Sequence, residues 1–149
     1  MPRFCANLSL MFTGYPFVER YRAAARAGFA GVECHFPYGV PAPELATELH
    51  AHHLEQVLFN LPPGDWAAGE RGIACLPDRI DEFEAGVAHA IDYAHALGCR
   101  RINCLAGIAP ADTDRAELLS VMARNLRFAA RALAGAGIEL MIEPINTRD

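Results

Sequence analysis

Short apolar segments alternate along the chain with longer segments in which apolar residues recur every three or four positions. The short segments are bounded by Gly, Pro or polar residues and are typical of β-strands, whereas the longer ones have the spacing of amphipathic helices. The predicted strands lie at residues 4–8, 31–35, 56–59, 101–107 and 138–143. The predicted helices run from 16 to 28, from about 43, from 80 to 97, and from 112 or 113 to the glycines at 135 and 137.

Local signals also predict where these helices end and which faces they bury. Gly28 and Gly98 each close a helix, and Asp112 or Thr113 can cap the last one. The buried face of that last helix is predicted to consist of Leu119, Met122, Leu126, Ala129 and Leu133. The strand at residues 138–143 is apolar and β-branched, which predicts a buried strand.

Strands that alternate with helices predict a parallel sheet with right-handed crossovers. An open doubly wound sheet and part of a (β/α)₈ barrel both fit this order. A dinucleotide-binding sheet is disfavoured because no G-x-G-x-x-G motif follows the first strand. Each unit takes about 33 residues, the repeat of a barrel of about 250 residues. We therefore expect an α/β fold of the parallel TIM-barrel type, with residues 1–149 as the N-terminal part of one domain, covering five strands and four helices.

Composition excludes several classes of function. The 149 residues are 52% hydrophobic and carry a net charge of −5 without a basic run, so no nucleic-acid-binding surface is predicted. No apolar run approaches the ~20 residues of a membrane helix, and no signal-peptide pattern is present. Five cysteines without a C-x-x-C pair indicate reduced thiols in a cytoplasmic protein. All 13 basic residues are arginine, which excludes lysine Schiff-base chemistry within this stretch.

Several residues at the ends of predicted strands are candidates for a binding site, because barrel enzymes carry their chemistry at the carboxyl ends of their strands. Glu143 ends the last predicted strand, and its alternative role is that of a solvated acid at the surface. The other strand-end candidates are Asn7, Glu33, His35, Asn60 and Gly107, each of which could instead stabilise a loop.

The stretch of residues 61–77 is longer than an ordinary connection between a strand and a helix, so we expect a lid or a disordered loop. Its Trp66, Glu70 and Arg71 favour a lid, in which Arg71 binds a substrate carboxylate and Trp66 excludes water. The alternative is a surface loop with Arg71 in a salt bridge.

Four segments carry a recognisable pattern: F-C-A-N-L-S-L-M-F at residues 4–12, A-G-F-A-G-V-E at 27–33, F-N-L-P-P-G-D-W-A-A-G-E-R-G at 59–72 and I-E-P-I-N-T-R-D at 142–149. They closely resemble the hydroxypyruvate isomerase family, which belongs to the xylose-isomerase-like TIM barrels. The resemblance covers residues 2–149. Its specific part is the segment at residues 59–72, whereas the A-G-F-x-x-V-E pattern is shared widely across the superfamily.

The resemblance implies a divalent-metal-dependent isomerase that interconverts hydroxypyruvate and 2-hydroxy-3-oxopropanoate (tartronate semialdehyde). In that family the Glu that ends strand five is both a metal ligand and one of two acid/base carboxylates, and Glu143 occupies that position. The other ligands, an Asp, a Gln or His and the second Glu, come from later strands than this sequence contains. We therefore expect residues 1–149 by themselves to be inactive.

The chemistry of that reaction explains why it needs carboxylates and a divalent metal ion. Moving a carbonyl between adjacent carbons passes through an enediolate, for which carboxylates serve as acid and base and a divalent cation stabilises the charge. Hard oxygen ligands favour Mg²⁺ or Mn²⁺, the cofactor that we expect at Glu143. The residues expected to contact the small-molecule substrate are Asn7, Asn60, Trp66, Glu70, Arg71 and Gly107.

Three alternatives remain open. The substrate can be a longer sugar acid, a 2-oxo-tetronate, on the same fold. A metal-dependent endonuclease of the superfamily is disfavoured because it would need a basic face and several histidine ligands. The chain can also be a truncated, non-catalytic fragment.

A partial barrel exposes two strand edges and an inward face that includes Leu8, Val57 and Met141, so we expect a homo-oligomer, aggregation or association with the missing half.

Overall fold

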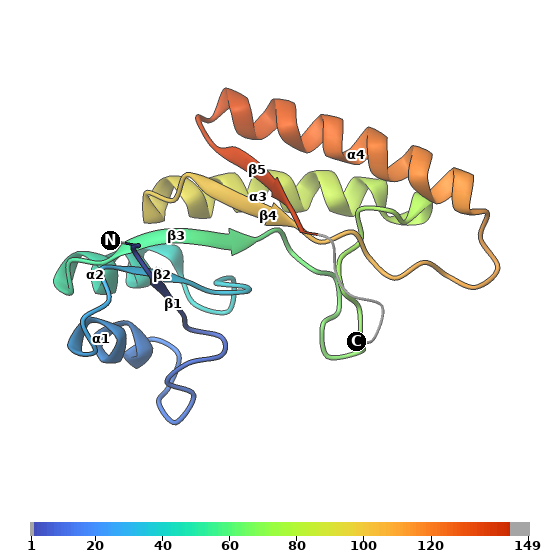
Figure 1. Ribbon diagram of the computed structural model, residues 1–149. Helices are drawn as coiled ribbons and strands as arrows, with labels where there is room; N and C mark the ends of the chain where they lie inside the picture. The colour runs from blue at the N-terminus through green and yellow to red at the C-terminus, as the bar shows by residue number, and fades with distance from the viewer. Residues whose placement is uncertain (1, 144–149) are drawn as a thin grey trace.

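A computed structural model describes residues 2–143 and shows one five-stranded sheet with four α-helices among them (Figure 1). The strands are β1 (Cys5–Asn7), β2 (Gly31–Glu33), β3 (Glu55–Asn60), β4 (Arg101–Cys104) and β5 (Glu139–Ile142). The helices are α1 (Glu19–Arg26), α2 (Ala42–Ala51), α3 (Ile80–Leu97) and α4 (Arg115–Gly135), and a short 3-10 helix at Pro77–Arg79 precedes α3. The predicted alternation of strands and helices is confirmed. Residues 144–149, which complete the recognisable segment at 142–149, lie outside the described residues.

The five strands are parallel and lie in sequence order, β1-β2-β3-β4-β5. This is the order of consecutive strands in a TIM barrel, and it excludes the doubly wound sheet, in which the strand order reverses at a switch point. Figure 1 shows this succession of strands from β1 to β5. The prediction of a partial parallel barrel is therefore confirmed.

The core lies between the sheet and the helices. Ala6, Val32, Phe59 and Ile102 come from four successive strands and are fully buried. They pack in one cluster with helix residues that are also fully or almost fully buried, namely Tyr21, Leu45, Val87, Ala90 and Leu133. Full burial of a large apolar side chain contributes about 1.5–3 kcal/mol, so this layer fixes the strands and aligns their carboxyl ends.

The start of α4 differs from the prediction. Asp114, rather than Asp112 or Thr113, is the N-cap, and its side chain accepts a hydrogen bond from the backbone N–H of Ala116 at 3.2 Å. The reason is geometric, because a capping side chain must lie directly before the first helical residue to reach the free N–H groups of the first turn.

The buried face of α4 differs from the prediction in its first turn. Leu119 is 55% exposed, whereas Leu118 is 5% exposed. Ala129 and Leu133 are fully buried in the core cluster, as predicted, and Leu126 packs against it. Successive residues point about 100° apart around a helix, so Leu118 and Leu119 cannot both face the core. Neither α4 nor any other helix within residues 2–143 is long and apolar enough to cross a membrane.

The strand β5 is not the buried strand that the sequence predicts. Met141 is 42% exposed and Ile142 is 53% exposed, because β5 pairs with β4 alone among the described residues. Val57 is half-buried, as expected for the inward face. The expectation that Leu8 is uncovered is wrong, since its side chain is fully buried in the core cluster.

Candidate active site

A cavity of about 940 Å³ lies at the carboxyl ends of the strands. At or directly after its carboxyl end, each of the five strands contributes a polar residue to its lining: Asn7 from β1, Glu33 from β2, Asn60 from β3, Asn103 from β4 and, directly after β5, Glu143. Parallel strands bring these distant positions to a single edge of the sheet. That edge, where barrel enzymes carry their chemistry, therefore holds two carboxylates and three carboxamides.

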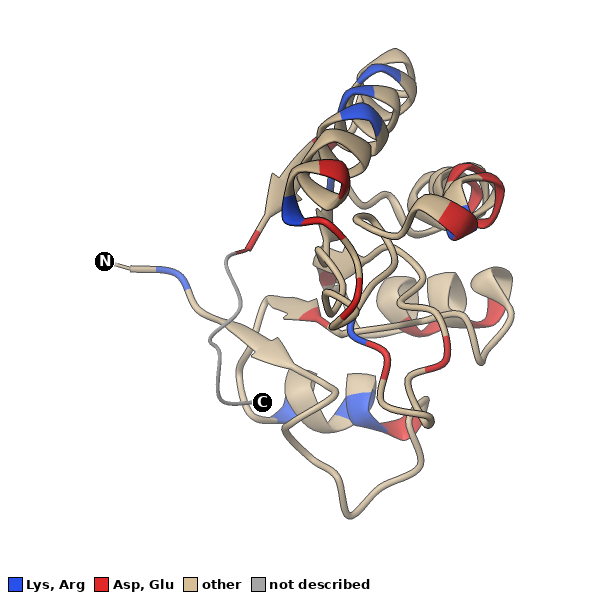
Figure 2. Cartoon of the chain, turned by 90° about the vertical axis from the view of Figure 1, so that its right-hand side faces the viewer, with Lys and Arg blue, Asp and Glu red and all other residues tan. Residues whose placement is uncertain are grey.

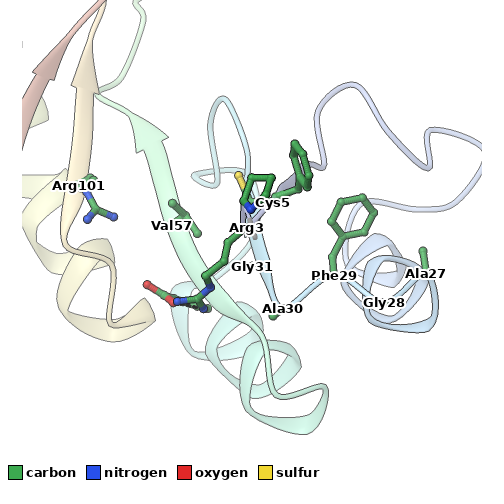
Figure 3. A pocket seen from close by; sticks show the side chains of 12 residues that line it. Arg3, Cys5, Ala27, Gly28, Phe29, Ala30, Gly31, Val57 and Arg101 are labelled. Carbon is green, nitrogen blue, oxygen red and sulfur yellow. Dashed lines mark ion pairs between the residues drawn. The ribbon is translucent and has the colours of Figure 1, made fainter.

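A second cavity, of about 580 Å³, lies at the amino ends of the strands and is shown in Figure 3. Its lining includes an ion pair between Arg3 and Glu55, whose charged atoms are 4.0 Å apart and whose side chains are exposed. Val57 and Arg101 line both cavities, so the two are opposite ends of one concave face. The amino end has no cluster of carboxylates among the described lining residues, and we place the candidate site at the carboxyl end.

The carboxamide of Asn7 holds the carboxylate of Glu33. Asn7 Nδ2 donates to Glu33 Oε1 at 2.9 Å, and Asn7 Oδ1 accepts the backbone N–H of Ser9 at 3.0 Å, which fixes the amide orientation. A register shift between Val32 and Glu33 in the pairing of β2 with β3 re-aims the Glu33 side chain. Burial, followed by the nearby charge of Glu33, raises the pKa of the Cys5 thiol. Cys5 is therefore protonated at neutral pH and is no candidate nucleophile.

Asn103 links the polar residues of three adjacent strands. Its Nδ2 donates to Asn60 Oδ1 at 3.0 Å and to Glu143 Oε2 at 3.4 Å. Asn103 is 3% exposed, whereas Glu143 is exposed, so a buried amide contacts an accessible carboxylate. The backbone of Asn60 is fixed as well, because Tyr38 Oη donates to its carbonyl at 2.7 Å and its own N–H donates to the His35 carbonyl at 2.9 Å. We call Asn60, Asn103 and Glu143 the Asn103 cluster.

The loop after β3 adds Trp66 and Arg71 to the lining of the same cavity. The guanidinium carbon of Arg71 lies 4.0 Å from the centroid of the Trp66 ring, and Trp66 packs against Phe36 with ring centroids 4.9 Å apart. Arg71 Nη1 donates to the Glu70 carbonyl at 2.8 Å. None of the ion pairs within residues 2–143 involves Arg71. Arg71 Nη1 also donates to the Trp66 carbonyl at 3.3 Å, whereas Nε and Nη2 make no hydrogen bond within residues 2–143 and are available to an anion in the cavity.

Glu70 and Gly107 do not line the cavity in the described part of the chain. Glu70 Oε1 accepts from Arg79 Nη1 at 2.8 Å, and the Glu70 carboxylate also accepts the backbone N–H of Asp65. The hydrogen bond from Arg79 holds the pKa of the Glu70 carboxyl below its usual value. Gly107 has a φ of 102°, and a Cβ there would lie 2.8 Å from the carbonyl oxygen of Gly72. Both positions therefore fasten the loop after β3 to its surroundings.

The structure thus brings together, in one lining, five of the residues that the sequence suggested as a site: Asn7, Asn60, Trp66, Arg71 and Glu143. Glu33 and His35, the strand-end candidates of β2, lie there too. Sequence reasoning missed Asn103. The available signal was its polarity inside an otherwise apolar run, since Ile102, Cys104 and Leu105 on either side are buried.

The residues at the carboxyl edge fit part of a metal site. Their donors are hard oxygen atoms, which suit Mg²⁺ or Mn²⁺. Glu143 supplies an accessible carboxylate, and Asn103 Oδ1 is buried without a hydrogen-bond partner among the described residues. No group of three or more His, Cys, Asp and Glu side chains within residues 2–143 is arranged to hold a metal ion. A full set of ligands therefore needs groups beyond these residues.

Known proteins share both the sequence and the fold of this chain. The family described as xylose isomerase-like TIM barrel matches residues 21–149. The chain is 51% identical to a 2-oxo-tetronate isomerase of Cupriavidus necator and 52% identical to a hydroxypyruvate isomerase of Escherichia coli K12, over 149 residues that make up 57% and 58% of those proteins. A crystal structure described as AP endonuclease, family 2, from Brucella melitensis superposes with a TM-score of 0.96 and 52% identity, over 99% of this chain and 57% of that one. The chain spans little more than half the length of the relatives it matches.

Proposed function

The chain belongs to the xylose isomerase-like TIM barrel family, and from this membership we propose that it forms the N-terminal part of an isomerase that interconverts hydroxypyruvate and 2-hydroxy-3-oxopropanoate. The observation that carries the proposal is the position of Glu143, which follows β5 in the lining of the cavity and is held there by Asn103. Relatives that are half identical over the whole chain and are named as isomerases support it.

Glu143 is the proposed acid/base group. The reaction removes a proton from the carbon that bears a hydroxyl and returns one to the adjacent carbonyl carbon, which a positioned carboxylate can do. Asn103 holds Glu143 Oε2, and no hydrogen bond within residues 2–143 uses Oε1. One oxygen is thus oriented and the other is free to accept the proton. A second carboxylate on the opposite side of the substrate would complete the transfer.

Arg71 and Trp66 are the proposed groups for binding and shielding the substrate. The substrate carries a carboxylate, and a guanidinium without an ion-pair partner is a suitable charge-assisted donor for it. The indole beneath Arg71 adds an apolar wall that excludes water from the reacting carbons. Asn7 and Asn60 present carboxamides to the hydroxyl and carbonyl oxygens.

A divalent metal ion, Mg²⁺ or Mn²⁺, is part of the proposal. When bound, it would supply positive charge that stabilises the enediolate. Glu143 is the residue of this chain that would hold it, together with ligands from outside residues 2–143. Asn103 would support this role, since a carboxylate ligand is commonly oriented by a hydrogen-bonded neighbour.

A 2-oxo-tetronate is the second candidate substrate, and two observations favour it. The relative from Cupriavidus necator carries that name, and the cavity of about 940 Å³ has room for a longer acid. The Asn7–Glu33 pair lies on β1 and β2, across the sheet from Glu143, where it can bind an additional hydroxyl. The ratio of kcat/KM for the two acids distinguishes these substrates.

The test uses the protein expressed from its whole reading frame. Metal is removed with a chelator, Mg²⁺ or Mn²⁺ is added back, and the interconversion is followed with hydroxypyruvate and with a 2-oxo-tetronate. We expect metal-dependent turnover of at least one of the two acids, lost in Glu143→Gln. Absence of turnover with both acids in the wild-type protein would contradict the proposed function and would favour a non-catalytic fragment.

An endonuclease function, which is the activity named for the Brucella protein, has less support. The net charge is −5. Figure 2 shows that basic positions follow one another along α4, where Arg124, Arg127 and Arg131 lie, but none of these arginines lines the candidate cavity. A phosphate backbone is bound through a continuous basic surface, which this pattern does not supply. Metal-dependent cleavage of duplex DNA by the wild-type protein would contradict this argument.

We also propose that the protein acts in the cytoplasm on a small molecule. All five cysteines are free thiols, and four of them are buried. Free thiols in this number are typical of a reducing compartment. Persistence of unmodified thiols in the protein purified without reductant, measured by mass spectrometry after alkylation, tests this placement.

A further inference from the structure

Asn103 lies where the packing of the strand would favour an apolar residue. Its neighbours Ile102, Cys104 and Leu105 are buried, and Asn103 itself is 3% exposed. Burial of a carboxamide is unfavourable unless both its nitrogen and its oxygen are hydrogen-bonded. Among the described residues the amide nitrogen of Asn103 is hydrogen-bonded, whereas its amide oxygen has no hydrogen-bond partner. The packing of β4 therefore does not explain an asparagine at this position.

The amide nitrogen of Asn103 is fully used in holding two neighbours. The carboxylate of Glu143 and the Oδ1 atom of Asn60 both accept hydrogen bonds. The Asn103 nitrogen carries two hydrogens and donates one to each of these oxygens. The register of the sheet brings these residues together. Asn60 pairs with Asn103 between β3 and β4, and Asn103 pairs with Met141 between β4 and β5, just before Glu143.

Glu143 has little else to fix its side chain. It follows the end of β5 and is exposed. Within residues 2–143 its one side-chain hydrogen bond is the bond from Asn103, and it takes part in none of the ion pairs. A free glutamate samples many rotamers, whereas a buried donor on the neighbouring strand favours the rotamers that keep Oε2 within its reach.

We propose that Asn103 is a positioning residue, which orients the carboxylate of Glu143 for proton transfer and the carboxamide of Asn60 toward the substrate; this inference rests on the proposed function. Asn103 acts through these two side chains and needs no contact with the substrate. Removal of a hydrogen-bond partner that orients an active-site carboxylate typically costs about 10–100-fold in activity. Because Arg71 and Trp66, the main proposed substrate contacts, remain, most of the loss belongs in kcat, and the loosened Asn60 changes KM by no more than about threefold.

The test compares Asn103→Leu, which has a similar volume and no donor, with Asn103→Asp, which keeps the shape and the polarity but presents a carboxylate. Gln56→Leu is the matched control, because Gln56 is 2% exposed on β3 and does not line the cavity. Crystal structures of the wild-type protein and the variants, made from the whole reading frame, report the position of the Glu143 carboxylate. Steady-state kinetics with hydroxypyruvate and thermal unfolding complete the set.

We expect both Asn103 variants to lose about 10–100-fold in kcat with KM within threefold, and the Glu143 carboxylate to move from its wild-type position. Gln56→Leu should lower the unfolding temperature without lowering kcat. An unchanged kcat, or a Glu143 carboxylate in its wild-type position in Asn103→Leu, would overturn the inference. If the wild-type protein turns over neither acid, the proposed function is wrong, and the crystal structures alone decide the role of Asn103. If Asn103→Leu does not fold, the kcat of Asn103→Asp and the position of its Glu143 carboxylate decide the inference by the same criteria.

Discussion

The guanidinium of Arg71 is stacked on the indole of Trp66, with 4.0 Å between Arg71 Cζ and the ring centroid. Trp66 in turn packs against Phe36 and lies near His35, with ring centroids 4.9 and 6.2 Å apart. Arg71 is therefore presented to the cavity on an aromatic support rather than on a freely moving side chain. The two residues should act as a unit, but their loss should affect different kinetic constants.

Arg71→Ala should mainly raise KM. The lost contact is a charge-assisted hydrogen bond of about 1.5–3 kcal/mol, which corresponds to an increase of about 10–150-fold. Arg71→Lys is the matched variant, since it keeps the charge but loses the planar donor fork and the stacking on Trp66. Steady-state kinetics should rank KM as wild type, then Lys, then Ala. A KM for Arg71→Ala within twofold of the wild-type value would show that Arg71 does not bind the substrate.

Trp66→Ala should lower kcat more than it changes KM. The indole shields the cavity from water and supports Arg71, and its removal weakens both effects. Trp66→Phe keeps an aromatic surface and should retain most of the activity. The measurement is kcat for the three proteins at saturating substrate. Equal kcat values would mean that the loop after β3 is structural or merely exposed.

The loop should loosen in acid because of Glu70. The hydrogen bond from Arg79 lowers the folded-state pKa of Glu70 below its ordinary value of 4.5. The ionised carboxylate thus contributes stability that is fully present above about pH 4.5 and is lost as the pH falls through the lowered pKa. Trp66 is the only tryptophan, so its fluorescence between pH 6 and pH 2 reports the change. An identical titration in Glu70→Gln would rule out this carboxylate as the cause.

A polypeptide of residues 1–149 by itself should associate. Within the described residues β1 and β5 each pair with one strand only, and Met141 and Ile142 on β5 are 42% and 53% exposed. Open edges and exposed apolar residues favour pairing with another chain. Light scattering should give a mass above that of the monomer, and adding the remainder of the barrel as a separate chain should reduce it. A stable, monodisperse monomer would contradict this expectation.

Periodicity predicts the order of the elements because it depends on local sequence. The apolar spacing from Ile80 to Leu97 and the glycine that follows give the bounds of α3 as observed, with Gly98 in the left-handed conformation at φ 64°. The start of α4 is harder to predict, since Asp112, Thr113 and Asp114 are all acceptable caps and the sequence alone does not select among them.

The rest of the site depends on contacts between distant positions. No local pattern indicates that Asn103 meets Glu143, because that contact follows from the pairing of β4 with β5. The pairing of Glu70 with Arg79 similarly requires the loop to fold back on itself. The exposure of β5 depends on which strands lie beside it, which an apolar run in the sequence does not show.

The most direct measurement is the exchange of the substrate carbon-bound proton with solvent, followed by NMR in deuterated water with Mg²⁺ or Mn²⁺ and hydroxypyruvate. It compares the wild-type protein, made from its whole reading frame, with Glu143→Gln and with the control Glu139→Gln. Glu139 begins β5, the strand that Glu143 follows; it is exposed and pairs with Arg101 at 3.4 Å. Gln has nearly the volume of Glu but cannot act as a base. The account predicts that wild type and Glu139→Gln exchange the proton and that Glu143→Gln folds normally without doing so, whereas near-wild-type exchange by Glu143→Gln would contradict it.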